Sequence, residues 1–215
     1  MAHVSKAKFD TITELYDPQQ PNLLKAGDVL IHHANKTETY KDSAYHASMM
    51  CNHPTQGTLL CYDSCPGHNG VSSRAMAQFG DLAVVFRLNS KPDYGSAAAA
   101  IGAAMGVGGF IGAVGYSGGA LGMERAARVP FHSAAFTNKT AARLTKYKNN
   151  ANKPKNVICT EFCVVSYQLA IQNSADPYFP QLDGKFLYPK ELESYFLHHA
   201  TYWDLVGKVT GPNRV

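Results

Sequence analysis

Charged side chains are scarce in this sequence. They make up 17% of its 215 residues, whereas hydrophobic residues make up 45%. A chain with so little charge and so much apolar material does not stay disordered, because it can bury enough surface to offset the entropy of folding. At this length it can enclose one good hydrophobic core, so we expect a single domain over residues 1–215.

Cysteine is also sparse, and its number is odd. A disulfide framework built from five cysteines would leave one thiol over, and a chain of this length does not need such cross-links. The first segment, Met1 to Leu24, is polar and lacks the apolar stretch of a secretory signal peptide. We therefore expect synthesis and folding in a reducing cytoplasm. Export would have to use a route that does not read such a signal.

The sequence has no signature of a nucleic-acid-binding module, although its net charge is +4. Much of that positive charge gathers just before residue 159. A solvated basic loop is the simplest interpretation of this cluster, and attraction of an anionic substrate or surface is the alternative. Nucleic acid is not an expected partner. The basic residues concerned are Lys139, Arg143, Lys146, Lys148, Lys153 and Lys155.

The segment from Tyr94 to Met123 carries no charge and consists mostly of alanine and glycine. Such a segment is long enough to cross a bilayer, and its regularly spaced small residues are a helix-packing device in membranes. Bulky apolar residues are few, however, and glycine is costly in a water-exposed helix. A flexible or closely packed insertion is therefore the favoured interpretation, and membrane contact through residues 94–123 is the alternative.

Strands followed by helices, without regular alternation, predict an α+β fold with a mostly antiparallel sheet. Period-two apolar patterns and turn residues mark the strands, and longer amphipathic stretches mark the helices. The expected strands are Ala26–His32, Tyr45–Asn52, Gly57–Ser64 and Leu82–Leu88. The expected helices are Phe9–Tyr16, Ser72–Phe79, Cys159–Gln172 and Pro189–His198.

A candidate nucleophile stands at the start of one of these helices. The short apolar run Asn156–Ile158 leads directly into Cys159. A thiol at a helix N-terminus lies in the positive end of the helix dipole, which lowers its pKa. The base that such a thiol needs could be His46, which opens an apolar strand far upstream. A cysteine with a histidine distant in sequence is the arrangement expected of thiol hydrolases.

Other cysteines and histidines suggest alternatives. Cys61 with Cys65, and Cys159 with Cys163, have ligand-like spacing, and His68 follows the first pair closely, so a zinc site can be considered. These cysteines nevertheless fall on a predicted strand and a predicted helix, where structural zinc is uncommon, and we expect no metal or other cofactor. Cys51, Cys61 and Cys163 are expected in the core. The pairs His32-His33 and His198-His199 are interpreted as surface or rim residues.

The order of these pieces resembles the circularly permuted branch of the NlpC-type papain-like superfamily. That branch includes the YiiX-like hydrolases and the lecithin retinol acyltransferase group, and its histidine strand precedes its cysteine helix. The chain departs from the pattern in its glycine-rich insertion and in Ala47-Ser48, where the family more often has Val-Gly. The matching pieces are Gly27–Ile31, His46–Met50, Gly70-Val71 leading into Leu82–Leu88, and Cys159–Phe162.

The resemblance implies roles for three residues. Cys159 would be the nucleophile, His46 its base, and Asp63, at the end of the third strand, the residue that orients the histidine. Asp28 and His68 are the competing candidates for this third position. The backbone N–H of Cys159 would contribute to an oxyanion hole.

The resemblance also implies an activity and a setting. We expect a cysteine hydrolase that cleaves amide bonds, with bacterial peptidoglycan peptide as the favoured substrate. Permuted members of the family include toxins delivered by the type VI secretion apparatus, so secretion machinery and a cognate immunity protein are expected partners. The site of action would be the periplasm of a target cell. The alternatives are a lipid ester hydrolase or acyltransferase acting at membranes, and a papain-like module that binds without catalysing.

Overall fold

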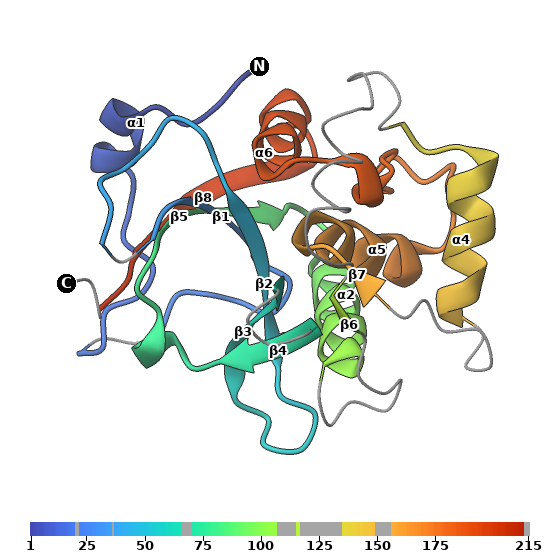
Figure 1. Ribbon diagram of the computed structural model, residues 1–215, viewed down its shortest axis with the longest axis horizontal. Helices are drawn as coiled ribbons and strands as arrows, with labels where there is room; N and C mark the ends of the chain where they lie inside the picture. Colours follow the sequence, from blue (N-terminus) through green and yellow to red (C-terminus); the bar gives the residue numbers. More distant parts are fainter. Residues whose placement is uncertain are drawn as a thin grey trace.

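The computed structural model describes residues 1–19, 22–35, 37–65, 70–106, 115–116, 135–148 and 156–212. Its main feature is a six-stranded sheet with the order β4-β3-β2-β1-β5-β8, in which all neighbouring strands are antiparallel (Figure 1). The strands are β1 (Val29–Ala34), β2 (His46–Asn52), β3 (Leu59–Cys65), β4 (Gly70–Arg74), β5 (Leu82–Leu88) and β8 (Trp203–Thr210). A small parallel pair, β6 (Gly115–Tyr116) and β7 (Asn156–Val157), forms a second sheet that contacts β3 and β4 at the edge of the first.

The described chain also contains helices on either side of these strands in the sequence. They are α1 (Lys6–Thr11), α2 (Pro92–Met105), α4 (Asn138–Lys148), α5 (Cys159–Ile171) and α6 (Pro189–His198), with short 3-10 turns η2 (Met76–Gln78) and η5 (Gly184–Phe186). The protein is therefore α+β with an antiparallel main sheet, as the sequence predicts.

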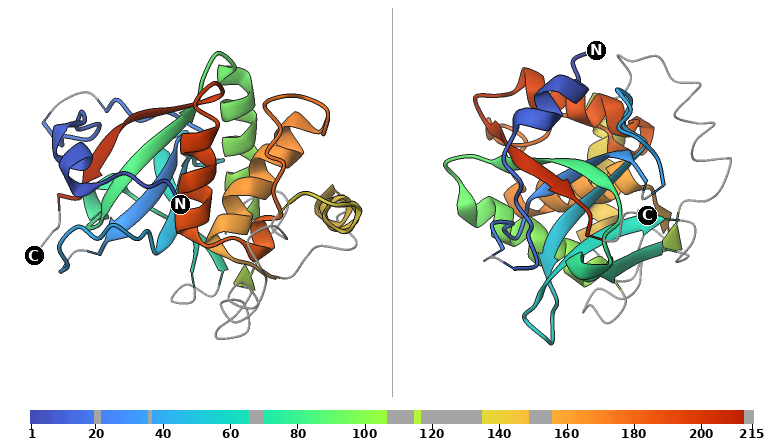
Figure 2. Two further views of the ribbon diagram at one scale, coloured as in Figure 1. Left: turned by 90° about the horizontal axis from the view of Figure 1, so that it is seen from above. Right: turned by 90° about the vertical axis from the view of Figure 1, so that its left-hand side faces the viewer.

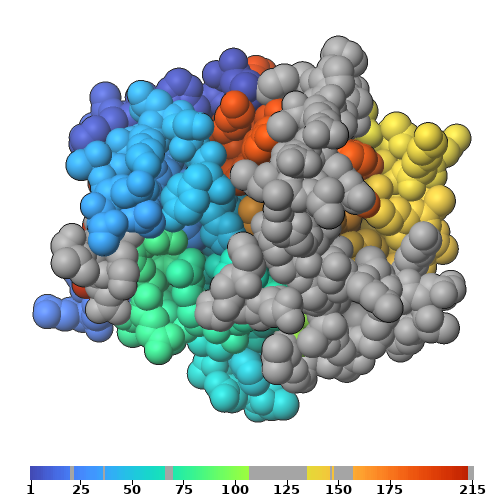
Figure 3. Space-filling model, viewed as in Figure 1, coloured from blue at the N-terminus to red at the C-terminus, as the bar shows by residue number. Residues whose placement is uncertain are grey.

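The elements form layers. Helices α2, α5 and α6 cover one face of the sheet, and α4 packs on the outer side of α5 (Figure 2). In the space-filling view α4 forms the edge of the molecule opposite the N-terminal segment (Figure 3). The core between sheet and helices includes Met49, Phe86 and Phe162, each at most 1% exposed. A second apolar cluster lies on the other face of the sheet, where Leu15 packs near Phe79.

The predicted elements agree with the structure in part. Leu82–Leu88 and Pro189–His198 have the predicted bounds, and α5 ends one residue earlier than predicted. The prediction of a helix over Ser72–Phe79 was wrong: this stretch contains the end of strand β4 and the turn η2. The N-terminal helix also lies earlier than predicted, because Ser5 caps it by accepting a hydrogen bond from the Lys8 N–H.

The first part of the glycine- and alanine-rich segment is the core helix α2. Its small residues let backbones approach closely, since a Cβ added at Gly102 would lie 2.5 Å from the Met49 side chain. A Cβ at Gly27 would lie 2.6 Å from the backbone of Gly95, so the turn before β1 also depends on glycine. Close packing was one of the two forms expected for this insertion. Residues 107–114 and 117–123 lie outside the described residues.

Membrane contact through this segment was the alternative. Among the described residues no helix has both the length and the apolar character needed to cross a membrane. Within α2, Ala98, Ala99 and Ala103 are at most 2% exposed because they pack in the core.

Candidate active site

The site lies where strands β2 and β3 separate. Their ladder begins at the pair Ser48 and Asp63, so Ala47 does not pair with β3, while Ser64 continues to pair with β4. The Ser64 hydroxyl instead donates a hydrogen bond of 2.8 Å to the carbonyl oxygen of Val157, just before α5. The segment before α5 is therefore bonded to β3 at the point where the pairing of β2 with β3 ends.

Cys159 is the first residue of α5 and is partly exposed. Its sulfur accepts hydrogen bonds from the backbone N–H groups of Ala47 and Thr160, and its side chain is hydrogen-bonded to His46. The first N–H groups of a helix have no partner within the helix and carry partial positive charge. The freed peptide of Ala47 and the start of α5 thus provide N–H donors around one sulfur atom.

His46 stands between Cys159 and Asp63. Its Nε2 lies 3.1 Å from Oδ2 of Asp63, which leaves Nδ1 for the thiol. The His46 and Asp63 side chains are 15% and 9% exposed, so bulk water screens their interaction weakly. The three residues predicted from the sequence are therefore in contact, in the order Cys159, His46, Asp63.

The electrostatics favour a charged pair. Burial alone would lower the pKa of His46, but the Cys159 thiolate and the bonds to Asp63 and Cys159 outweigh it and raise that pKa to about 10. Burial would raise the pKa of Cys159, whereas the charge and hydrogen bond of His46 hold it below the usual value. Both shifts favour the form of the pair in which Cys159 is a thiolate and His46 an imidazolium.

Asp63 is held in its ionised form. Burial opposes its ionisation, but the hydrogen bond to His46 and the charges of His46 and Arg74 lower its pKa below the usual value. Arg74 lies on β4, with Nη2 3.4 Å from Oδ2 of Asp63. Arg74 was not predicted as a site residue, because Ser72–Phe79 was expected to form a helix. The stretch Gly70–Arg74 does not alternate apolar and polar residues, so no local pattern marked it as a strand.

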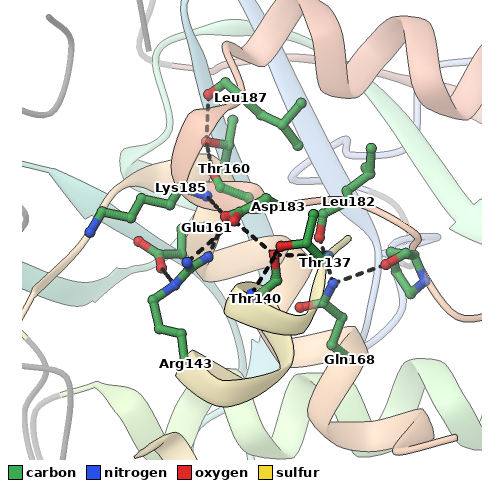
Figure 4. Close-up of polar contacts among 12 residues, drawn as sticks. Thr137, Thr140, Arg143, Thr160, Glu161, Gln168, Leu182, Asp183, Lys185 and Leu187 are labelled. Atoms are coloured by element: carbon green, nitrogen blue, oxygen red, sulfur yellow. Dashed lines mark hydrogen bonds and ion pairs between the residues drawn. The ribbon is translucent and has the colours of Figure 1, made fainter. Parts of the chain in front are cut away.

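The first turn of α5 is anchored from the opposite side by the segment that follows it (Figure 4). The Thr160 hydroxyl lies 3.0 Å from the carbonyl oxygen of Gly184 and 2.9 Å from that of Leu187. No Cβ could be added at Gly184, since it would lie 2.7 Å from Cα of Glu161. These contacts position the start of the helix, and with it the candidate nucleophile.

An arginine from α4 completes this anchor. Arg143 donates from Nε to Oε1 of Glu161 at 3.1 Å and also forms an ion pair with Asp183. Burial raises the pKa of Glu161, and the nearby charge of Arg143 opposes the rise. The expectation of a solvated basic loop was wrong for this part of the cluster: Lys139–Lys148 lies in helix α4, and Arg143 forms ion pairs with Glu161 and Asp183. Lys153 and Lys155 lie outside the described residues.

The competing third residues are placed elsewhere or not described. Asp28 is fully buried and forms a two-pronged ion pair with Arg87, with both N–O distances 2.7 Å. It also accepts a hydrogen bond from the Lys25 N–H, as a turn residue does. His68 lies outside the described residues.

The remaining cysteines and histidines separate into core and surface. Cys51, Cys61 and Cys163 are buried, as predicted, and Cys65 is partly exposed. The described residues contain no group of three or more His, Cys, Asp or Glu that could hold a metal ion. The interpretation of His32 and His33 as surface residues was wrong, since both are fully buried.

Comparisons with known proteins do not place the chain in a family: no protein-family model, curated protein or solved structure matches it.

Proposed function

We propose that this chain is a cysteine hydrolase that cleaves amide bonds and has a circularly permuted papain-like fold. The observation that carries the proposal is the contact series from Cys159 through His46 to Asp63. These residues come from α5, β2 and β3 and meet at the one place where the β2–β3 ladder opens. Their order along the chain, with the histidine before the cysteine, is the order of the permuted family.

Acylation uses the charged pair directly. The Cys159 thiolate attacks the carbonyl carbon of the substrate, and the negative charge moves to the carbonyl oxygen. The backbone N–H of Cys159 lies in the first turn of α5, where no intrahelical acceptor exists, and would donate to that oxygen. As the C–N bond breaks, the His46 imidazolium gives its proton to the leaving amine, and a thioester to Cys159 remains.

Deacylation reverses the roles of the histidine. Neutral His46 takes a proton from water, the resulting hydroxide attacks the thioester, and the C–S bond breaks. The acid product leaves, and the thiolate–imidazolium pair is restored. Throughout, Asp63 accepts a hydrogen bond from the Nε2–H of His46 and stabilises the positive form of the ring, so that Nδ1 always faces the sulfur.

The favoured substrate is bacterial peptidoglycan peptide, and the favoured setting is that of an antibacterial toxin delivered by type VI secretion into the periplasm of a target cell. The resemblance to permuted members among such toxins supports this setting. A cognate immunity protein would then protect the producing cell. Lipid ester chemistry is the alternative, but the buried residues of α2 cannot at the same time engage a membrane.

The decisive experiment combines thiol labelling with two substrates. One sample of purified protein is treated with iodoacetamide at pH 7, and a separate, unalkylated sample is incubated with peptidoglycan sacculi or phospholipid vesicles. We expect rapid alkylation of Cys159 and release of peptide fragments from sacculi only, both lost in Cys159→Ala. Acyl products from the vesicles would favour the lipid alternative. An unreactive Cys159 would refute both enzymes and favour a binding module.

A further inference from the structure

A second set of polar residues lies directly behind the candidate site, on the same face of the sheet. His32 on β1 contacts Ser48 through Nε2 at 2.7 Å and Asp81 through Nδ1 at 2.8 Å. His32 and Ser48 are fully buried and Asp81 is 9% exposed. The His32 ring packs edge-on against the His46 ring, with centroids 4.9 Å apart. His32, Ser48 and Asp81 therefore form a buried layer behind the candidate site, which we call the inner layer.

The hydrogen bonds of this inner layer are donated in one direction, from Cys61 to Ser48, then to His32 and then to Asp81. The Cys61 thiol donates to the Ser48 hydroxyl at 3.2 Å. Because Ser48 then donates to Nε2 of His32, the single proton of the neutral ring sits on Nδ1 and is donated to Asp81. Burial lowers the pKa of His32 to about 4, which agrees with a neutral ring. Of the two packed histidine rings, only that of His46 then carries a positive charge.

Arg74 joins the two layers. Its Nη2 lies 3.4 Å from Oδ2 of Asp63 and 3.4 Å from Oδ2 of Asp81. Its guanidinium also packs over the Phe79 ring, 5.0 Å from the centroid. The arginine side chain, which is 29% exposed, is therefore held by three contacts, with Asp63, Asp81 and Phe79. One cation consequently balances two carboxylates, only one of which touches the candidate base.

Ser48, His32 and Asp81 have the residue types of a hydrolytic triad, but they cannot serve as one. The Ser48 hydroxyl is fully buried and is already bonded to His32 and Cys61, so no substrate can reach it. The contacts instead fix where Asp81 points, and Asp81 in turn faces Arg74.

We propose that Arg74 is a positioning residue of the candidate active site, held between Asp63 and Asp81 by the buried layer of Ser48, His32 and Asp81. This inference rests on the proposed function, since it assigns Arg74 to the Cys159–His46 pair. Arg74 is a second partner of Asp63 beside His46. Its positive charge offsets the negative charges around the Cys159–His46 pair. Without it, two carboxylates would face the site with no cation between them.

The charge balance can be tested because every group around Arg74 is known within the described structure. Removing the cation in Arg74→Met makes the site more negative, so thiolate formation at Cys159 moves to higher pH. Removing one carboxylate in Asp81→Asn does the opposite. We expect shifts of about one pH unit each way, and near cancellation in the double variant. The facing groups are Asp63 and Cys61 on β3, His46 and Tyr45 at the start of β2, His32 on β1 and Asp81 before β5.

The measurement is the pH profile of iodoacetamide alkylation at Cys159, read by mass spectrometry. A Cys65→Ser background removes the other partly exposed thiol, and Cys159→Ala provides the blank. Arg74→Lys keeps the charge and should keep the wild-type midpoint. Thermal melting of each variant separates loss of folding from a change in the site.

The outcomes are distinct. Opposite shifts in Arg74→Met and Asp81→Asn, restored in the double variant, support the proposal. Unchanged midpoints, or shifts in the same direction, overturn it. If Arg74→Met does not fold, the Asp81→Asn profile decides alone, because that change is isosteric and removes one negative charge while the guanidinium is kept. A wild-type Cys159 that is unreactive at pH 7 refutes the proposed function instead, whatever the variants do.

Discussion

Replacing Asp63 by asparagine removes the charge behind His46 and keeps the shape of the side chain. The hydrogen bond that changes joins Nε2 of His46 to Oδ2 of Asp63 over 3.1 Å. A hydrogen bond to a charged group contributes about 1.5–3 kcal/mol, and 1.36 kcal/mol corresponds to one pKa unit. The pKa of His46, raised to about 10 in the native protein, should therefore fall by about 1–2 units in Asp63→Asn.

The sign of this change determines the pH dependence. A raised pKa keeps His46 protonated until the pH rises through about 10. In Asp63→Asn the imidazolium, and with it the stabilised thiolate, should be lost at correspondingly lower pH. Turnover near neutral pH should fall by roughly one to four powers of ten.

The assay is an NMR titration of histidine ring carbons, with the His46 signal identified by its disappearance in His46→Gln. Hydrolysis is measured on the same samples. Asp28→Asn is the matched control, because Asp28 is a buried carboxylate paired with Arg87 and away from the site. It should lower stability by about 3–5 kcal/mol and leave the His46 titration unchanged. An unaltered His46 titration and wild-type turnover in Asp63→Asn would refute the assigned role of Asp63.

Three further predictions follow from other parts of the structure. Directing the protein to the bacterial periplasm should lyse cells while cytoplasmic expression is tolerated, and Cys159→Ala or His46→Ala should each abolish lysis; continued killing by the cysteine variant would place the activity elsewhere. Gly27→Ala should lower the free energy of unfolding by more than 2 kcal/mol, since Gly27 has φ +94° and no room for a Cβ, whereas Gly57→Ala, with φ +66° and open space, should cost only about 1–2 kcal/mol in denaturant titrations. Arg143→Met leaves two buried carboxylates without their cation and should lower the melting temperature and the rate of Cys159 alkylation together; loss of neither would show that α4 does not hold the start of α5.

The three candidate site residues were predictable because each stands at a marked boundary in the sequence. Cys159 follows a short apolar run, His46 opens an apolar strand, and Asp63 closes the next one. Antiparallel pairing then sets Asp63 opposite Ser48, two residues from His46 and on the same face. The local pattern therefore specifies both the elements and their alternation, which suffices to bring His46 and Asp63 together.

The inner layer was not predictable in the same way. His32 looked like a surface residue because two adjacent histidines suggest a polar segment, yet β1 lies inside the sheet between β2 and β5. Arg74 and Asp81 contact the site only through strand order, which no local pattern reveals. Helix α2 was missed for a different reason: glycine and alanine give no amphipathic signal, and the helix is stabilised by close packing on α5 and β2.

The Cys159 site forms where β2 separates from β3 and α5 packs on the sheet. The reactivity of the thiol therefore depends on the completion of folding. The sulfur of Cys159 receives the N–H of Ala47 and the ring of His46 from a strand more than a hundred positions away in the chain. Closing a loop of that length costs about 4 kcal/mol of chain entropy, so the contact forms only when the packing of α5 on the sheet offsets it. In an unfolded or partly threaded chain Cys159 is an ordinary, mostly protonated thiol. Reactivity thus arises with native docking of α5, and the alkylation rate of this one cysteine reports how much of the population has reached it.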